Sequence, residues 1–403
     1  MNKRKYRLFI ICCLVLDLLV MLISGYRYLD RKIPDEIQIS RGKKTEDVTE
    51  VLSTPFVTFE EAVTVSQDGG YILPCKLLGY IPFKEIKVTP ADDQEIYVSG
   101  STIGIYMQTE GVLVIDTGEI QNRNGETEEP ARNIIRQGDY IISFNGEKIS
   151  TKRELIDDIS ELDGSEVTLG ISRKGESIPV SVTPVKDKKG DYKLGIWVRD
   201  NVQGLGTITF LTKNNTFAAL GHGIHDIDTS TLLMIKRGTL YRTSIQKVQK
   251  GSKGNPGTME GIIVYNRFHR LGVIEKNTDA GIYGELNSDR SWIGEEVPIQ
   301  VAKKEEIKTG EARIRCYIDG EVKEYTICIT QIDKESDQVN KGMVIQVTDT
   351  ELLEKTGGII QGMSGSPIIQ NGKLIGAVTH VFVQDSTKGY GIFIENMLKE
   401  EES

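Results

Sequence analysis

The chain has 403 residues, with 41 Gly and only 11 Pro, and it is 38% hydrophobic and 27% charged. These proportions exclude a disordered or collagen-like chain, and the length predicts two or three folded domains. Asp and Glu number 58 against 49 Lys and Arg, so the net charge is −9. A nonspecific nucleic-acid binder needs a basic excess, so we expect no nucleic-acid partner.

The N-terminus combines a basic cluster with the most apolar segment of the chain. Four Lys and Arg residues within positions 3–7 precede LFIICCLVLDLLVMLISGY at 8–26, which carries the single charge Asp17. This run approaches the roughly 20 residues that a helix needs to cross a bilayer. It is longer than the apolar region of a signal peptide, and no small-residue cleavage site follows it.

We therefore expect residues 1–26 to form an uncleaved signal anchor, with a cleaved signal peptide as the alternative. The basic cluster places the N-terminus in the cytoplasm and the rest of the chain outside. Residues 27–60 are polar, charged and without a sustained period, so we expect an extracytoplasmic linker there.

Residues 90–186 show the pattern of a small α+β domain. Strands are expected at 105–108, 111–116 and 140–144, a helix at 151–162, and two β-rich runs after it. The segment resembles a PDZ domain, because Thr102-Ile103-Gly104-Ile105 fits the family's carboxylate loop and RQGDYIISFNGEKI fits its later elements.

The PDZ resemblance implies a peptide-binding role for Ile103, Gly104 and Ile105. Successive backbone N–H groups of such a loop can bind a terminal carboxylate, and the strand after it can accept an added peptide strand. The alternative is a small α/β domain in which Gly104 merely permits a turn.

Residues 187–403 consist of short β-like runs separated by Gly, Asn and Asp, which predicts an all-β domain. The length fits two six-stranded barrels. An Asp319-Gly320 turn predicts a hairpin that pairs Cys316 with Lys323. Cys328 would then lie on the opposite face, so no disulfide with Cys316 is expected.

The segment GMSGSP at 362–367 is the sharpest local motif in the chain. A glycine-rich turn can expose a hydroxyl and let backbone N–H groups converge, as a nucleophile with an oxyanion hole requires. With the hairpin signal Asn371-Gly372 after it, the motif resembles the G-x-S-G-[GS]-P signature of chymotrypsin-like serine proteases. That match implies Ser364 as nucleophile and the N–H groups of Gly362 and Ser364 as the oxyanion hole.

A serine nucleophile needs a base, and imidazole is the usual one. The four histidines are His222, His225, His269 and His380. His222 lies in Gly-His-Gly at the end of an apolar run and precedes Ser364, which is the order of the chymotrypsin-like class. We interpret His225 as a solvated loop residue and His380 as strand interior.

The same segment offers a metal alternative. His222, His225, Asp226 and Asp228 are all potential ligands, but no second cluster completes a site. We expect neither a metal nor another cofactor.

The third member of a triad orients the imidazole. By the chymotrypsin order Asp279 is the natural choice. However, the second half of the chain resembles the SpoIVB peptidases of endospore-forming bacteria, in LGIWVRDNVQGLGTITF, FAALGHGIHDIDT, GMSGSPIIQNGKLIGAVTHVFV and KGYGIFIENML. This resemblance implies the triad His222, Asp349 and Ser364, with Asp279 as the alternative acid.

The expected fold is therefore mainly β, with an N-terminal membrane anchor, a PDZ-like α+β domain and a chymotrypsin-like double β-barrel serine peptidase domain. The family resemblance implies a membrane-anchored serine endopeptidase of sporulation, located between forespore and mother cell. It would cleave itself and a membrane-bound regulator, and so trigger pro-sigma-K processing. The alternatives are an HtrA-like quality-control protease, in which the PDZ domains follow the protease domain, and a non-catalytic PDZ scaffold.

Overall fold

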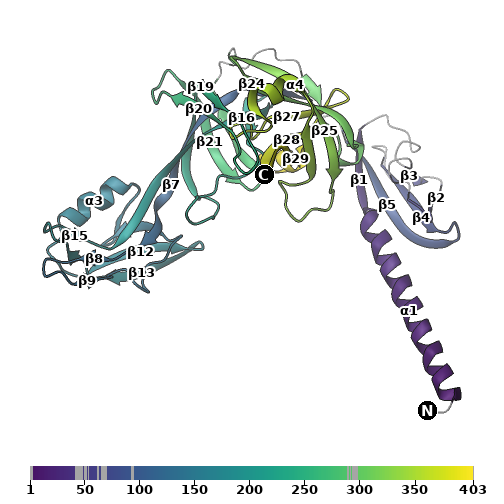
Figure 1. The fold of residues 1–403 in the computed structure, drawn as a ribbon, viewed down its shortest axis with the longest axis horizontal. Coiled ribbons are helices and arrows are strands. Elements are labelled where there is room, and N and C mark those ends of the chain that lie inside the picture. Colours follow the sequence, from purple (N-terminus) through teal and green to yellow (C-terminus); the bar gives the residue numbers. More distant parts are fainter. Residues whose placement is uncertain are drawn as a thin grey trace. The chain divides into compact units, whose positions relative to one another are not determined.

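A computed structural model describes residues 3–40, 49, 52, 54–60, 63–64, 70–91, 95–287, 290, 292 and 298–402. The chain divides into two compact units, Met1–Gln94 (unit 1) and Glu95–Ser403 (unit 2). Figure 1 shows the fold of both units.

Unit 1 begins with a long apolar helix and continues into a small sheet. Its elements are α1 (Lys3–Lys32), β1 (Glu36–Ser40), β2 (Val57–Phe59), β3 (Val63–Thr64), β4 (Tyr71–Leu77) and β5 (Ile81–Ala91). Within α1, the 20 residues Ile11–Asp30 have a mean hydropathy of 1.8 and are long and apolar enough to cross a membrane. The predicted N-terminal apolar helix is therefore confirmed, and it suggests membrane anchoring.

The described part of the predicted linker, 27–60, contains regular structure. It holds the last turns of α1 and the strands β1 and β2, which pair with β5 and β4 in the order β1-β5-β4-β2. These strands have only five and three residues, which is too short for a period to be visible in the sequence. Leu73, Ile86 and Val88 are fully buried between the sheet and its connections.

Unit 2 is almost entirely β. Its strands are β6 (Glu95–Val98), β7 (Thr102–Thr117), β8 (Ile120–Gln121), β9 (Thr127–Glu128), β10 (Tyr140–Phe144), β11 (Glu147–Lys148), β12 (Val167–Arg173), β13 (Glu176–Val182), β14 (Val185–Lys186), β15 (Tyr192–Lys193), β16 (Ile196–Leu211), β17 (Thr216–Ala219), β18 (Ile235–Tyr241), β19 (Thr243–Gln249), β20 (Thr258–Ile263), β21 (Arg270–Thr278), β22 (Gly281–Leu286), β23 (Pro298–Gln300), β24 (Gly310–Ile318), β25 (Glu321–Ile332), β26 (Met343–Val347), β27 (Pro367–Gln370), β28 (Lys373–Phe382) and β29 (Asp385–Phe393). The helices are α3 (Lys152–Ser160), η1 (Lys304–Glu306), α4 (Thr350–Thr356) and α5 (Ile394–Glu402).

The PDZ region is built on β7, β10, β12 and β13, with α3 beside them. The strand predicted at 140–144 is β10 as expected. The helix predicted at 151–162 is α3, which is capped by Thr151: its hydroxyl accepts from the Glu154 N–H, and the Glu154 carboxylate accepts from the Thr151 N–H. The strands predicted at 105–108 and 111–116 are one continuous strand, β7.

Two rings of strands lie after the PDZ region in unit 2. The order β7-β18-β21-β22-β17-β16 closes into a first ring, because β7 also pairs with β16. The second is the closed barrel β24-β25-β26-β29-β28-β27. The expected mainly β architecture with a barrel-containing protease-like domain is confirmed, but the first ring borrows β7 from the PDZ region.

The β24–β25 hairpin has the predicted register. Cys316 lies opposite Lys323, and Asp319 and Gly320 adopt φ values of +54° and +91° in the turn. Cys316 and Cys328 are both free cysteines, as expected.

Candidate active site

The serine loop lies between α4 and β27. Gly362 and Gly365 both adopt positive φ, +105° and +92°, a region that side chains with Cβ rarely enter. A Cβ on Gly365 would also lie 2.1 Å from the carbonyl oxygen of Thr207. The two glycines therefore permit a sharp turn pressed against β16. Within it Ser364 is only partly buried, whereas its neighbours from Gly362 to Ser366 are buried.

Two N–H groups in this loop are oriented by hydrogen bonds to the carbonyl groups of their own peptide units. In a trans peptide unit the C=O and N–H point in opposite directions. The Gln361 carbonyl accepts from the Met259 N–H, and the Met363 carbonyl accepts from the Ser366 N–H, both at 2.9 Å. These bonds hold the peptide units that carry the N–H groups of Gly362 and Ser364. Neither N–H has an acceptor within the part of the chain that the structure describes.

Strand β16, which belongs to the first ring, forms hydrogen bonds to the same loop. The Thr207 N–H donates to the Ser364 carbonyl at 3.0 Å, and the Thr207 hydroxyl donates to the Gly362 carbonyl at 2.9 Å. The buried Thr209 hydroxyl donates to the Gly365 carbonyl at 2.8 Å. No sequence signal marks these threonines, because they lie about 155 residues from the loop that they support.

His222 and Ser364 each contact a neighbouring residue of β28. The Ser364 hydroxyl donates to the Thr379 carbonyl at 2.8 Å, and the ring of the next residue, His380, lies 4.7 Å from the ring of His222. His222 Nδ1 lies 2.9 Å from the Gly223 carbonyl. Because a carbonyl only accepts, we assign the proton to Nδ1, which leaves Nε2 as the basic nitrogen.

The rings of His222 and His380, which are tilted by 35° to each other, both favour the neutral form. Burial lowers the pKa of His222 below its ordinary value, and the charge of His225 adds to this, while the Gly223 carbonyl opposes it. Burial, with the charges of His222, Lys341 and His225, lowers the pKa of His380 to about 4. His380, which the sequence indicated only as strand interior, is thus a wall of the site.

These shifts predict the acid limb of the pH profile. The His222 imidazole can act as a base only in its neutral form, and a lowered pKa extends the neutral form to lower pH. We therefore expect kcat/KM to fall with a midpoint below about 6.5, the ordinary value for histidine. The measurement is kcat/KM on a peptide substrate between pH 4 and 8. A midpoint near 7 or above would contradict the arrangement and indicate that a carboxylate already pairs with His222 in the free enzyme, whose groups the pH dependence of kcat/KM reports.

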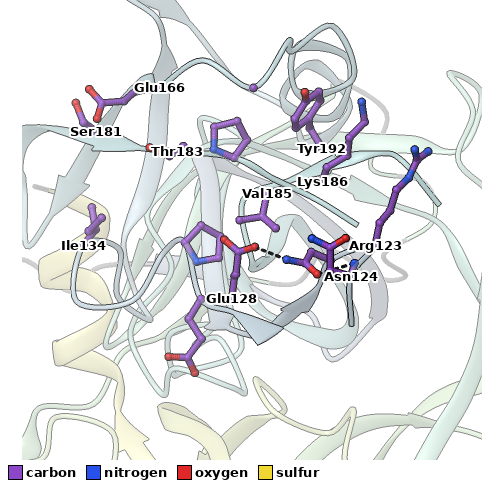
Figure 2. A pocket seen from close by; sticks show the side chains of 15 residues that line it. Arg123, Asn124, Glu128, Ile134, Glu166, Ser181, Thr183, Val185, Lys186 and Tyr192 are labelled. Carbon is purple, nitrogen blue, oxygen red and sulfur yellow. Dashed lines mark hydrogen bonds between the residues drawn. The ribbon is translucent and has the colours of Figure 1, made fainter. Parts of the chain in front are cut away.

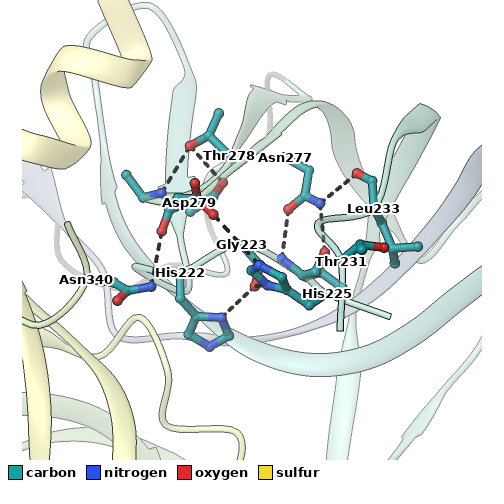
Figure 3. Close-up of polar contacts among 12 residues, drawn as sticks. His222, Gly223, His225, Thr231, Leu233, Asn277, Thr278, Asp279 and Asn340 are labelled. Atoms are coloured by element: carbon teal, nitrogen blue, oxygen red, sulfur yellow. Dashed lines mark hydrogen bonds and ion pairs between the residues drawn. The ribbon is translucent and has the colours of Figure 1, made fainter. Parts of the chain in front are cut away.

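The two candidate acids contact groups other than the His222 ring. Asp349 caps α4, where Oδ1 accepts from the Leu352 N–H at 3.1 Å and Oδ2 from the Thr326 N–H at 3.2 Å. The exposed Asp279 approaches His225, with 3.7 Å between Oδ1 and Nε2 (Figure 3). Among the described residues, no hydrogen bond joins either carboxylate to His222, so the acid stays a prediction.

The residues considered as metal ligands are held in other ways. Asp226 is fully buried and forms an ion pair with Arg199, which also contacts Asp228 at 2.9 Å. Among the described residues, no group of three or more His, Cys, Asp and Glu side chains could hold a metal ion.

The residues predicted to bind a peptide do not form a loop. Ile103, Gly104 and Ile105 lie within β7, paired with β16 along one edge, and Gly104 and Ile105 are paired with β18 along the other. The isoleucine side chains are buried in the first ring, and a Cβ on Gly104 would lie 2.7 Å from the side chain of Ile263. At Gly104 and Ile105 both edges of β7 are already paired, which leaves no edge there for an added strand. The local match to a carboxylate loop could not reveal these long-range pairings.

An open cavity of about 860 Å³ lies in the PDZ region, away from these residues (Figure 2). Its lining includes Arg123, Glu128, Glu166, Lys186 and Tyr192, and it contains none of the predicted site residues.

Comparisons with known proteins agree with this architecture. Residues 190–398, just over half of the chain, match the family of SpoIVB peptidase S55, and residues 101–183 match the PDZ domain. The two matches together define a PDZ-containing serine peptidase. The chain belongs to the SpoIVB peptidase S55 family.

Individual proteins match a smaller part of this chain than the family model does. The putative zinc metalloprotease LL2128 of Lactococcus lactis subsp. lactis is 38% identical over 78 residues, which are 19% of this chain and 18% of that protein. The PDZ domain of an SdrC-like protein from Listeria monocytogenes is 23% identical, with a TM-score of 0.19, over 22% of this chain and 87% of that one. The active form of the Rv3671c protease from M. tuberculosis is 15% identical, with a TM-score of 0.27, over 50% and 73%.

Proposed function

We propose that this protein is a serine endopeptidase in which Ser364 is the nucleophile and His222 the general base. The observation that carries the proposal is the serine loop itself. Two N–H groups, of Gly362 and Ser364, are held in place by bonds to the opposite side of their peptide units and have no described acceptor. Preorganised donors of this kind stabilise the oxyanion of acyl transfer.

The Ser364 hydroxyl leaves the Thr379 carbonyl, gives its proton to Nε2 of His222, and attacks the carbonyl carbon of a peptide bond. The carbonyl oxygen becomes an oxyanion that accepts from the N–H groups of Gly362 and Ser364. His222 returns the proton to the leaving amine, and water then hydrolyses the acyl-enzyme. None of these steps needs a cofactor.

We propose Asp349 as the acid that supports His222, with Asp279 as the alternative. The support for Asp349 is the family resemblance, which aligns VTDTELLEKTGG with the family's acid. Because its two oxygens bind the Leu352 and Thr326 N–H groups here, pairing with His222 requires a rearrangement around the start of α4.

The biological role proposed here also rests on family membership. We propose that α1 anchors the protein, with its N-terminus in the forespore cytoplasm and its catalytic region between the two membranes. The substrates would be the protein itself and a membrane-bound regulator of pro-sigma-K processing, with recognition of peptide through the PDZ domain. Cleavage would make the protein an intercompartmental signal in sporulation.

A serine-directed phosphonate tests the catalytic assignment. We expect one covalent adduct per chain, on Ser364, when the folded protein is treated, and none after denaturation, because only the folded loop activates the hydroxyl. Mass spectrometry of the digested protein locates the adduct. A folded protein that takes no label and hydrolyses no peptide would instead be the PDZ scaffold.

A further inference from the structure

The turn between β4 and β5 carries an uncharged segment of exposed apolar residues. Residues 77–83 read LLGYIPF and are flanked by Lys76 and Lys84. The exposed fractions of the side chains are 62% for Leu78, 87% for Tyr80 and 56% for Ile81. Phe56, which precedes β2, is 68% exposed. The Leu78 N–H donates to the Phe56 carbonyl at 2.7 Å, so Phe56 belongs to the same group. We call Phe56 and residues 77–83 the hairpin tip.

A group of exposed apolar side chains marks an interaction surface, whereas single exposed ones are ordinary. The neighbouring helix indicates what this surface contacts. The ring of Phe83 lies 5.3 Å from that of Tyr26 in α1, edge to face. The Lys84 ammonium donates to the carbonyls of Asp30 and Ile33, at 3.1 and 2.7 Å.

These contacts set the depth of the hairpin tip along α1 (Figure 1). β5 runs parallel to β1, with Lys87 opposite Glu36, so the start of β5 points back toward the N-terminal end of α1. At about 3.3 Å per residue, Ile81 lies roughly 10 Å back from Lys84. At 1.5 Å per residue this equals about six or seven helical residues, from the level of Ile33 to that of Tyr26. Tyr26 lies within the apolar segment Ile11–Asp30.

We infer that the hairpin tip inserts into the interfacial layer of the phospholipid bilayer that α1 crosses. The inference rests on the proposed membrane anchoring. The composition of the hairpin tip suits this interfacial layer, because Tyr side chains collect at the boundary between membrane and water and the flanking lysines can extend toward the lipid head groups. Apolar groups of peripheral elements typically enter this layer by about 5 to 10 Å. Unit 1 would then hold the membrane at two points and could not turn freely about α1.

Quenching of tryptophan fluorescence by spin-labelled lipid tests this insertion. In the full chain with Trp197→Phe and Trp292→Phe, one tryptophan is introduced by Tyr80→Trp, by Tyr26→Trp as the helix reference, or by Lys87→Trp as the control. Each protein is reconstituted in phosphatidylcholine vesicles labelled near the head group. We expect quenching in the Tyr80→Trp protein to match the Tyr26→Trp protein and exceed the Lys87→Trp protein at least about twofold, since Lys87 lies roughly 20 Å from the turn.

The outcomes distinguish failure of the hairpin-tip insertion from failure of the membrane anchoring by α1. Quenching of Tyr80→Trp no greater than that of Lys87→Trp, while Tyr26→Trp is quenched, would overturn the insertion and leave the anchor intact. Absence of quenching in Tyr26→Trp would overturn the anchoring itself. Ile81→Trp reports on the same tip if Tyr80→Trp does not fold.

Discussion

The Ser364→Ala protein is expected to lose peptide hydrolysis by about 10⁶-fold in kcat, the scale seen when a serine protease loses its nucleophile. The reason is that the other hydroxyl of the loop, that of Ser366, is fully buried, whereas Ser364 is partly exposed. Self-cleavage should disappear with it. The measurements are kcat on a peptide substrate and mass spectrometry of the N-termini released from the purified chain.

Ser366→Ala is the matched control in the same loop. Ser366 is fully buried, and its hydroxyl has no hydrogen-bond partner among the described residues. Removing an unsatisfied buried hydroxyl should leave both stability and activity nearly unchanged. If Ser364→Ala released the same N-termini as the unaltered chain, the cleavage would come from another protease, and the proposed self-cleavage would be wrong.

The second large effect concerns the acid. We expect Asp349→Asn to lower kcat by about 10⁴-fold, because an amide cannot hold the imidazole in its working tautomer or stabilise its charge. The amide oxygen can still accept from the Leu352 N–H, so α4 should keep its cap, but the bond from the Thr326 N–H is lost because the amide NH2 group cannot accept. Thermal unfolding measures the cost of that lost bond and so separates the effect on folding from the effect on catalysis. Asp349→Ala, in contrast, should also cost about 1 kcal/mol of stability through loss of the cap.

Asp279→Asn is the counterpart to Asp349→Asn. Asp279 is exposed and contacts His225 rather than His222, so its amide should retain most of the activity. The reverse pattern, with Asp279→Asn inactive and Asp349→Asn active, would transfer the role to Asp279. Full activity in both proteins would show that His222 works with the Gly223 carbonyl alone.

Several elements could be predicted because their signals are local. Thr151 and Glu154 form a capping box, and α3 begins where they predict. Asp319-Gly320 adopts the positive φ values of a tight hairpin turn, and that turn determines the pairing of Cys316 with Lys323. Each of these features depends on a few neighbouring residues.

The course of β7 could not be predicted in this way. Thr109-Glu110-Gly111 resembles a turn between two short strands, but β7 continues past it because β16 pairs with β7 on either side of these residues, up to Gln108 and again from Leu113, and β18 pairs up to Thr109. Those partners lie about 80 or more residues further along the chain. The same pairings place Gly104 inside the first ring.

The sequence by itself determined the apolar N-terminal helix, the PDZ region, the barrel class, and the serine and histidine of the proposed site, since each is written in a run, a turn or a short motif. Only the tertiary structure decided which N–H groups are free, that Thr207 and His380 support the site, where the two candidate carboxylates lie, and that the hairpin tip lies beside α1. The physical reason is that hydrogen bonds and packing between distant strands orient groups, whereas a local pattern specifies only which groups are available.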